Sequence, residues 1–125
     1  MGPKTKTILV VDNEWDEVAI LTSLLVTEGY GVQCSSNGLS ALRLLSESVI
    51  DLVLTDYMMP TMNGCELLRA MRASKETATT PVLMISGLPE IIVRMRCGLL
   101  GPFLRKPYPQ KLLLSLVHDL IFAEV

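Results

Sequence analysis

The sequence is poor in the residues that build metal and redox centres. Its 125 residues contain one histidine, His118, and three widely spaced cysteines, Cys34, Cys65 and Cys97. No pair of cysteines has the C-x-x-C spacing that zinc sites and thiol redox motifs use. We therefore expect Cys65 and Cys97 to be small packing residues in a reduced, cytoplasmic protein, and His118 to be an exposed helix residue.

Long apolar runs and an excess of basic residues are also absent. No apolar segment approaches the ~18 residues of a membrane span, and the N-terminus lacks a basic region followed by an apolar core. The 11 Lys and Arg residues against 13 Asp and Glu give a net charge of -2, without a basic stripe that could follow a phosphate backbone. The sequence therefore predicts neither a membrane anchor nor direct contact with nucleic acid.

Charged residues are scarce as well, at 19% of the chain against 50% hydrophobic residues. Soluble domains usually carry about 25% charged residues. We expect a single domain covering 1–125, with a core at about 6–124, that leaves some apolar surface exposed once its core is filled. That surface would suit a protein partner.

What the sequence does contain is an alternation of short apolar runs with longer amphipathic stretches. The apolar runs predict strands at 7–11, 31–35, 51–55, 81–86 and 102–106. Leucine-rich stripes predict helices at 15–28, 38–47, 64–73 and 109–123, and a short helix at 89–97, where three consecutive β-branched residues oppose helix formation. This order predicts an α/β fold, a doubly wound parallel sheet with helices on both faces.

Polar residues collect where these strands end. In chain order they are Asp12, Asn13, Glu14, Asp56, Ser86 and Lys106. Taken singly, an Asp or Asn here could cap a helix, and the lysine could be a solvated charge. Because ligands of such sheets bind beyond the carboxyl ends of the strands, we expect these residues to share one pocket. Carboxylates suit Mg²⁺, lysine and hydroxyl groups suit phosphoryl oxygens, and Asp56 is then a candidate nucleophile.

Four segments in this order resemble the receiver (CheY-like) domain of two-component response regulators. They are "ILVVDNE" at 8–14, "DLVLTDYMMPTMNG" at 51–64, "VLMISG" at 82–87 and "FLRKPY" at 103–108. The resemblance covers essentially the whole chain and implies a flavodoxin-like, five-stranded sheet in the order 2-1-3-4-5. It implies a signalling switch without catalytic turnover of its own, which receives a phosphoryl group from a sensor histidine kinase or a histidine phosphotransfer protein.

The resemblance also implies the role of each site residue. Asp56 matches the phosphoryl acceptor, Lys106 the lysine that contacts the phosphoryl group, and Ser86 and Phe103 the switch pair. Switching would reshape a homodimer or effector surface on the fourth helix, fifth strand and fifth helix, within 89–124. The implied Mg²⁺ ligands are Asp12, Asn13, Asp56 and the backbone carbonyl of Met58.

Asn13 departs from the family pattern, because relatives usually have a second acid there that contacts the metal. One unit charge at ~4 Å is worth at most about 4 kcal/mol at an effective dielectric constant of ~20. A residual difference of only ~1.4 kcal/mol changes affinity tenfold. We therefore expect weak Mg²⁺ binding, which Glu14 could compensate and Asn13→Asp would tighten. If Asn13 abolishes binding, the domain is instead a degenerate receiver that serves as a phosphorylation-independent interaction module.

Two further site positions are apolar in this chain. Met58 and Leu88 cannot orient an attacking water, so we expect slow self-dephosphorylation, although Met58 could simply cover the pocket. Met58 also disfavours a doubly wound, metal-dependent phosphatase, which usually needs a second acid two residues after its nucleophilic aspartate. Pro107 follows Lys106 at a position where the family often has a cis peptide.

Overall fold

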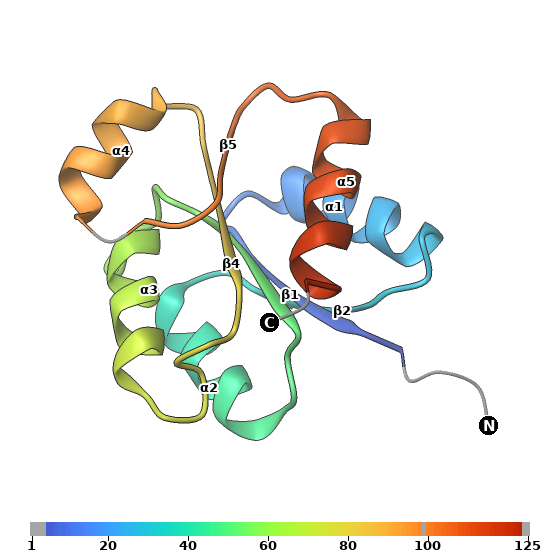
Figure 1. Cartoon of the computed structure of the whole chain (residues 1–125), viewed down its shortest axis with the longest axis horizontal. Coiled ribbons are helices and arrows are strands. Elements are labelled where there is room, and N and C mark those ends of the chain that lie inside the picture. Colours follow the sequence, from blue (N-terminus) through green and yellow to red (C-terminus); the bar gives the residue numbers. More distant parts are fainter. Residues whose placement is uncertain (1–4, 99, 124–125) are drawn as a thin grey trace.

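Five strands alternate with five helices in the computed structural model, which describes residues 5–98 and 100–123 (Figure 1). The strands are β1 (Thr7–Val11), β2 (Gly31–Ser35), β3 (Leu52–Asp56), β4 (Val82–Ser86) and β5 (Phe103–Arg105). The helices are α1 (Trp15–Thr27), α2 (Gly38–Glu47), α3 (Gly64–Ala73), α4 (Glu90–Cys97) and α5 (Gln110–Ile121). Position 99 and position 124 lie outside the described residues. Both fall within the output surface predicted at 89–124 and the domain core predicted at about 6–124.

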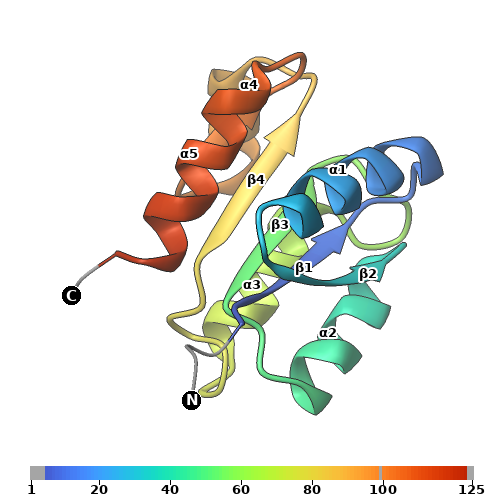
Figure 2. The ribbon, with the colours of Figure 1, turned by 90° about the vertical axis from the view of Figure 1, so that its right-hand side faces the viewer.

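The strands form one parallel sheet in the order β2-β1-β3-β4-β5, which confirms the predicted fold class and strand order. β2 pairs with one edge of β1, and β3 pairs with the other edge, followed by β4 and β5. Figure 2, turned toward the side that carries α1 and α5, shows neighbouring strands running in the same direction. The strand order reverses between β1 and β3, and ligands of such sheets bind at this reversal.

Helices cover both faces of the sheet, α1 and α5 on one and α2, α3 and α4 on the other (Figure 1). Successive residues of β1 serve opposite faces, because side chains alternate along a strand. Ile8 and Val10 pack with α1 and α5, whereas Leu9 and Val11 pack with the other three helices. All four are at most 1% exposed, so a central strand covered on both faces is apolar throughout.

The predicted helices and strands agree with the structure to within two residues at each end. Asp56 is the last residue of β3, where it pairs with Ile85, instead of following the strand as expected. The short helix expected at 89–97 is present as α4, which buries Val93 and carries a Glu90–Arg94 ion pair of 2.6 Å. Among the described residues, none of the helices combines the length and the apolar character that crossing a membrane requires.

Cys65 and Cys97 are joined as a disulfide, so the prediction that they serve only as packing residues is wrong. Their Cα atoms lie 5.3 Å apart, within the usual range for a disulfide, and both residues are buried. The bond ties the first turn of α3 to the end of α4 across a sequence separation of 32 residues. It therefore restrains α4, the helix whose formation the sequence least favoured.

The turn after β3 packs tightly against the strand. Gly64, the first residue of α3, donates its N–H to the carbonyl of Tyr57 at 2.9 Å. A Cβ atom at Gly64 would lie 2.6 Å from the carbonyl oxygen of Asp56. Asn63 caps the same helix by accepting the N–H of Glu66 at 2.9 Å, while the Glu66 side chain accepts the N–H of Asn63 at 3.0 Å. Glycine and cap together define the path of the chain beside Asp56.

Gly64→Ala is expected to lower the free energy of unfolding by about 1–3 kcal/mol, because the added methyl group meets a backbone carbonyl that has little room to shift. Gly101→Ala is the matched control. Its Cβ would meet no atom within 4 Å, so its effect should stay within about 0.5 kcal/mol. Urea unfolding measures both variants, and equal stabilities would contradict the close packing at Gly64.

Candidate functional site

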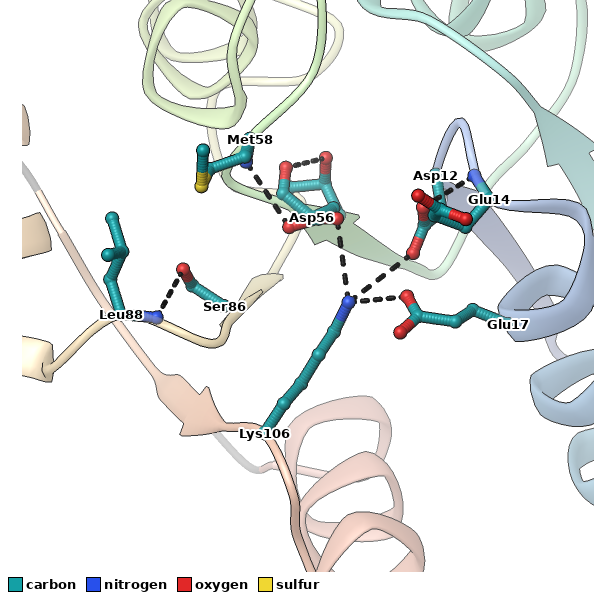
Figure 3. Close-up of polar contacts among 9 residues, drawn as sticks. Asp12, Glu14, Glu17, Asp56, Met58, Ser86, Leu88 and Lys106 are labelled. Atoms are coloured by element: carbon teal, nitrogen blue, oxygen red, sulfur yellow. Dashed lines mark hydrogen bonds and ion pairs between the residues drawn. The ribbon is translucent and has the colours of Figure 1, made fainter.

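Three charged residues from different strand ends meet at the carboxyl edge of the sheet (Figure 3). Asp12 follows β1, Asp56 ends β3, and Lys106 follows β5. The Nζ atom of Lys106 lies 3.7 Å from Oδ2 of Asp12 and 3.5 Å from Oδ2 of Asp56. The peptide bond between Lys106 and Pro107 is cis, as the resemblance implies. The edge thus gathers two carboxylates and an ammonium group from segments that are far apart in sequence.

A fourth charged residue, Glu17, joins this group, although the sequence reasoning did not select it. Its Oε2 atom pairs with Nζ of Lys106 in the closest of the three ion pairs of that lysine (Figure 3). One carboxylate oxygen from each of Asp12, Glu17 and Asp56 lies within 4.8 Å of the others. The site therefore contains three carboxylates, one of which is contributed by the first turn of α1 and none by Asn13 or Glu14.

The sequence did hold a signal for Glu17. Glu17 precedes Leu21 by four residues and Leu24 by seven, so it stands on the stripe that α1 turns toward the protein. An acid on an otherwise apolar helix stripe is uncommon unless it has a partner. Glu17 finds that partner in Lys106, 89 residues further along the chain. The presence of an acid on this stripe is explained only by a contact that the tertiary structure forms.

Backbone amides orient both aspartates. Oδ1 of Asp12 accepts the N–H of Glu14 at 2.9 Å, and Oδ1 of Asp56 accepts the N–H of Met58 at 3.2 Å. The second oxygen of each carboxylate, Oδ2, is the one that faces Lys106. The side chain of Met58 is largely exposed. Its contribution to this geometry comes from its backbone.

The remaining residues predicted for the site lie near the edge but outside the charged cluster. Ser86, the last residue of β4, is buried, and its Oγ accepts the N–H of Leu88 at 3.1 Å (Figure 3). Phe103 is half-buried and packs on the side of the sheet covered by α2, α3 and α4. Asn13 and Glu14 are exposed at the start of α1.

A cavity of about 600 Å³ opens beside the cluster, between α1 and the segment that leads into α5. Its polar lining consists of the four charged residues, Tyr108 and Gln110. Its apolar lining includes Val10, Leu21, Leu24, Leu54 and Ile85. A water molecule takes about 30 Å³ of liquid volume, so the cavity has room for a hydrated cation and a phosphoryl group.

Burial and mutual charge shift the pKa values of the cluster. Burial raises the pKa of Asp12 to about 7, and the Glu17 side chain and the Asp56 charge add to this effect. Burial also favours a higher pKa for Glu17, but interactions with Asp12 and Lys106 outweigh it and hold the pKa below its usual value. For Lys106, burial favours a lower pKa, yet the bond with Glu17 and the charges of Asp56 and Asp12 raise it above the usual range. Lys106 therefore stays charged at neutral pH, whereas the carboxyl group of Asp12 titrates close to neutral pH.

The fold and this edge together define a class of protein, the doubly wound α/β domain with an acidic site and a lysine where the strand order reverses. A model of the response regulator receiver domain matches residues 8–118, and the chain belongs to that family.

Similar proteins agree with this assignment. The chain is 35% identical over 116 residues to the transcriptional regulatory protein CpxR of Escherichia coli K12, covering 91% of this chain and 48% of CpxR. It is 31% identical over 121 residues to the probable transcriptional regulator ycf29 of Pyropia yezoensis, covering 94% and 54%. The signal receiver domain of a histidine kinase from Syntrophus aciditrophicus shares 30% identity at a TM-score of 0.86, covering 94% of this chain and 90% of that one. This chain spans about half the length of the two curated relatives.

The raised pKa of Asp12 predicts that stability falls as the pH rises from about 5 to about 7. Between its ordinary pKa of 3.8 and about 7, the folded state binds more protons than the unfolded state, so the free energy of unfolding decreases with pH. The lowered pKa of Glu17 acts in the opposite direction, but below its ordinary value of 4.5. Urea unfolding at several pH values, without divalent cations, measures the slope.

Asp12→Asn should flatten that slope, because an amide does not titrate. Asp16→Asn, an exposed acid four residues further along, should keep the slope of the native chain. Identical pH profiles for the native chain and Asp12→Asn would contradict the assignment of the titration to Asp12.

Proposed function

We propose that this domain is a signalling switch that accepts a phosphoryl group on Asp56 from the phosphohistidine of a sensor histidine kinase or a histidine phosphotransfer protein. The observation that carries the proposal is the pairing of Asp56 with Lys106, whose Nζ lies 3.5 Å from Oδ2 of the carboxylate at the open sheet edge. The ammonium offsets the charge of an arriving phosphoryl group. The domain is a stoichiometric acceptor in a cytoplasmic two-component system, without independent catalytic turnover.

In the transfer, an oxygen of Asp56 forms a bond to phosphorus while the P–N bond to the partner's histidine breaks. The released imidazole nitrogen takes up a proton. Lys106 contacts the transferred group and stabilises its charge. Ser86 ends the strand beside β3, so its hydroxyl can turn from the N–H of Leu88 to a phosphoryl oxygen. Phe103, which pairs with Met84 of the same strand, would carry this change toward α4.

Mg²⁺ is the cation that the donor set favours, because its members are hard oxygen ligands. Asp12, Asn13, Asp56 and the backbone carbonyl of Met58 would hold it. When bound, Mg²⁺ would offset part of the negative charge that accumulates during phosphoryl transfer. The neutral side chain of Asn13 is the one observation that favours the alternative, a degenerate receiver acting without phosphorylation.

The surface of α4, β5 and α5 is proposed as the output of the switch. It exposes Ile91, Met95, Leu112 and Phe122, each between 45% and 75%. Exposed apolar side chains of this kind are typical of an interface, here with a second copy of the chain or an effector protein. The net charge of -2 leads us to propose that the domain itself binds neither nucleic acid nor membrane.

Phosphoramidate plus Mg²⁺ should add one phosphoryl group to the native chain, detected by intact mass. Asp56→Ala should show no such gain. Asp16→Ala, which removes an exposed acid of α1, should be modified as the native chain is. If the native chain gains no mass at saturating Mg²⁺, the degenerate receiver is the correct description.

The phosphorylated domain should lose its phosphoryl group slowly, because the apolar side chains of Met58 and Leu88 cannot orient a water molecule. Met58→Asn should accelerate the loss several-fold. Val49→Asn, which changes another exposed apolar residue on a different part of the surface, should leave the rate unchanged. Intact mass followed over time after removal of the donor gives the rates. Rapid loss from the native chain, unaltered by Met58→Asn, would refute this explanation.

A further inference from the structure

Asn13 follows Asp12 in the chain but adds no charge to the cluster of Asp12, Glu17, Asp56 and Lys106. It lines two hollows on the side of β2 and α2, one together with Asp12, Cys34 and Ser35 and one with Asn37 and Met62. It does not line the cavity that Asp12, Glu17, Asp56 and Lys106 share. The position that usually supplies a second acid to the metal is thus neutral, and it does not contribute a charge to the cavity beside Lys106.

Glu17 lines the same cavity as Asp12, Asp56 and Lys106. One oxygen of its carboxylate lies within 4.8 Å of one carboxylate oxygen of Asp12 and of one carboxylate oxygen of Asp56. The helical backbone of α1 holds it five residues after Asp12, and its side chain is 38% exposed, so it is open to exchange with solvent cations. Mg²⁺ keeps several of its waters in proteins, so a carboxylate at this range can bind directly or through one water.

The charge balance of the cluster depends on Glu17. With Asn13 neutral, Asp12 and Asp56 alone would face the single positive charge of Lys106 and leave a net charge of -1. Glu17 adds the third carboxylate that brings the ionised cluster to -2, the charge it would have with an acid at position 13. Affinity for a divalent cation increases with the number of ligand charges.

We infer that Glu17 is the third acid of the Mg²⁺ site, supplying from the first turn of α1 the charge that Asn13 does not supply. This inference rests on the proposed function, since it concerns the same site. With Mg²⁺ bound, the Glu17 carboxylate would no longer pair with Lys106 alone, which would leave the lysine free to contact the phosphoryl group. If Glu17 served only as the counter-ion of Lys106, removing its charge would leave the affinity for Mg²⁺ unchanged or raise it.

The test is a calorimetric titration of the full chain with MgCl₂ at fixed pH and ionic strength, without phosphoryl donor. Glu17→Gln should weaken Mg²⁺ binding about tenfold, the change that corresponds to ~1.4 kcal/mol. Asp16→Asn removes the same charge from the neighbouring residue, which is exposed and does not line the cavity, and should change the affinity less than about twofold.

The double variant Asn13→Asp/Glu17→Gln moves the acid from one position to the other at constant net charge. It should bind Mg²⁺ about as tightly as the native chain, whereas Asn13→Asp alone should bind more tightly than either. Thermal unfolding of each variant confirms that it is folded. An affinity of Glu17→Gln equal to or above that of the native chain overturns the inference.

Asp56→Ala separates this inference from the proposed function. If Asp56→Ala loses Mg²⁺ binding and Glu17→Gln keeps it, only the role of Glu17 is wrong. If the native chain and Asp56→Ala give the same titration, the metal site itself is wrong, and the proposed function fails with it.

Discussion

The parallel pairing of the five strands is the constraint on which the rest of the molecule depends. Because all strands run in one direction, their carboxyl ends meet at one edge, and residues separated by up to 94 positions, from Asp12 to Lys106, become neighbours. The same pairing requires crossover helices on both faces. These helices remove the central strands from solvent, so polar side chains are confined to the strand ends, where the site is formed.

Confining charge to this edge has an electrostatic consequence. Asp12 is 5% exposed, and a buried carboxylate is unfavourable unless it is paired and hydrogen-bonded. The N–H of Glu14 and the ammonium of Lys106 provide that compensation, but three carboxylates share the one lysine. The cluster is consequently not neutralised from within. An arrangement of this kind stabilises the fold weakly and leaves a net negative charge at the open edge of the sheet.

Most of the fold was predictable because it depends on periodicity and on local turn chemistry. Fully apolar runs predict strands buried on both faces, and leucine stripes predict the helices that cover them. The predicted site was less complete. Asp12, Asp56 and Lys106 stand at strand ends, where topology alone brings side chains together. Glu17 lies within a helix, where neither a strand end nor a motif marks it.

The disulfide is a second feature that the sequence alone could not predict. The sequence contains Cys65 and Cys97 without a motif spacing, and their pairing requires α3 and α4 to lie side by side. No pattern within either helix specifies that contact. It follows from how both helices pack on one face of the sheet.

The sequence by itself determined the order of the elements, the parallel sheet and the identity of the residues at the strand ends, because these follow from short-range patterns. Only the tertiary structure decided which charges share Lys106, since that depends on where side chains of α1, β3 and β5 point after packing. Asn13 and Glu17 illustrate the difference. Asn13, the residue next to Asp12 in sequence, adds no charge to the cluster, and Glu17, five residues after Asp12, supplies its third carboxylate.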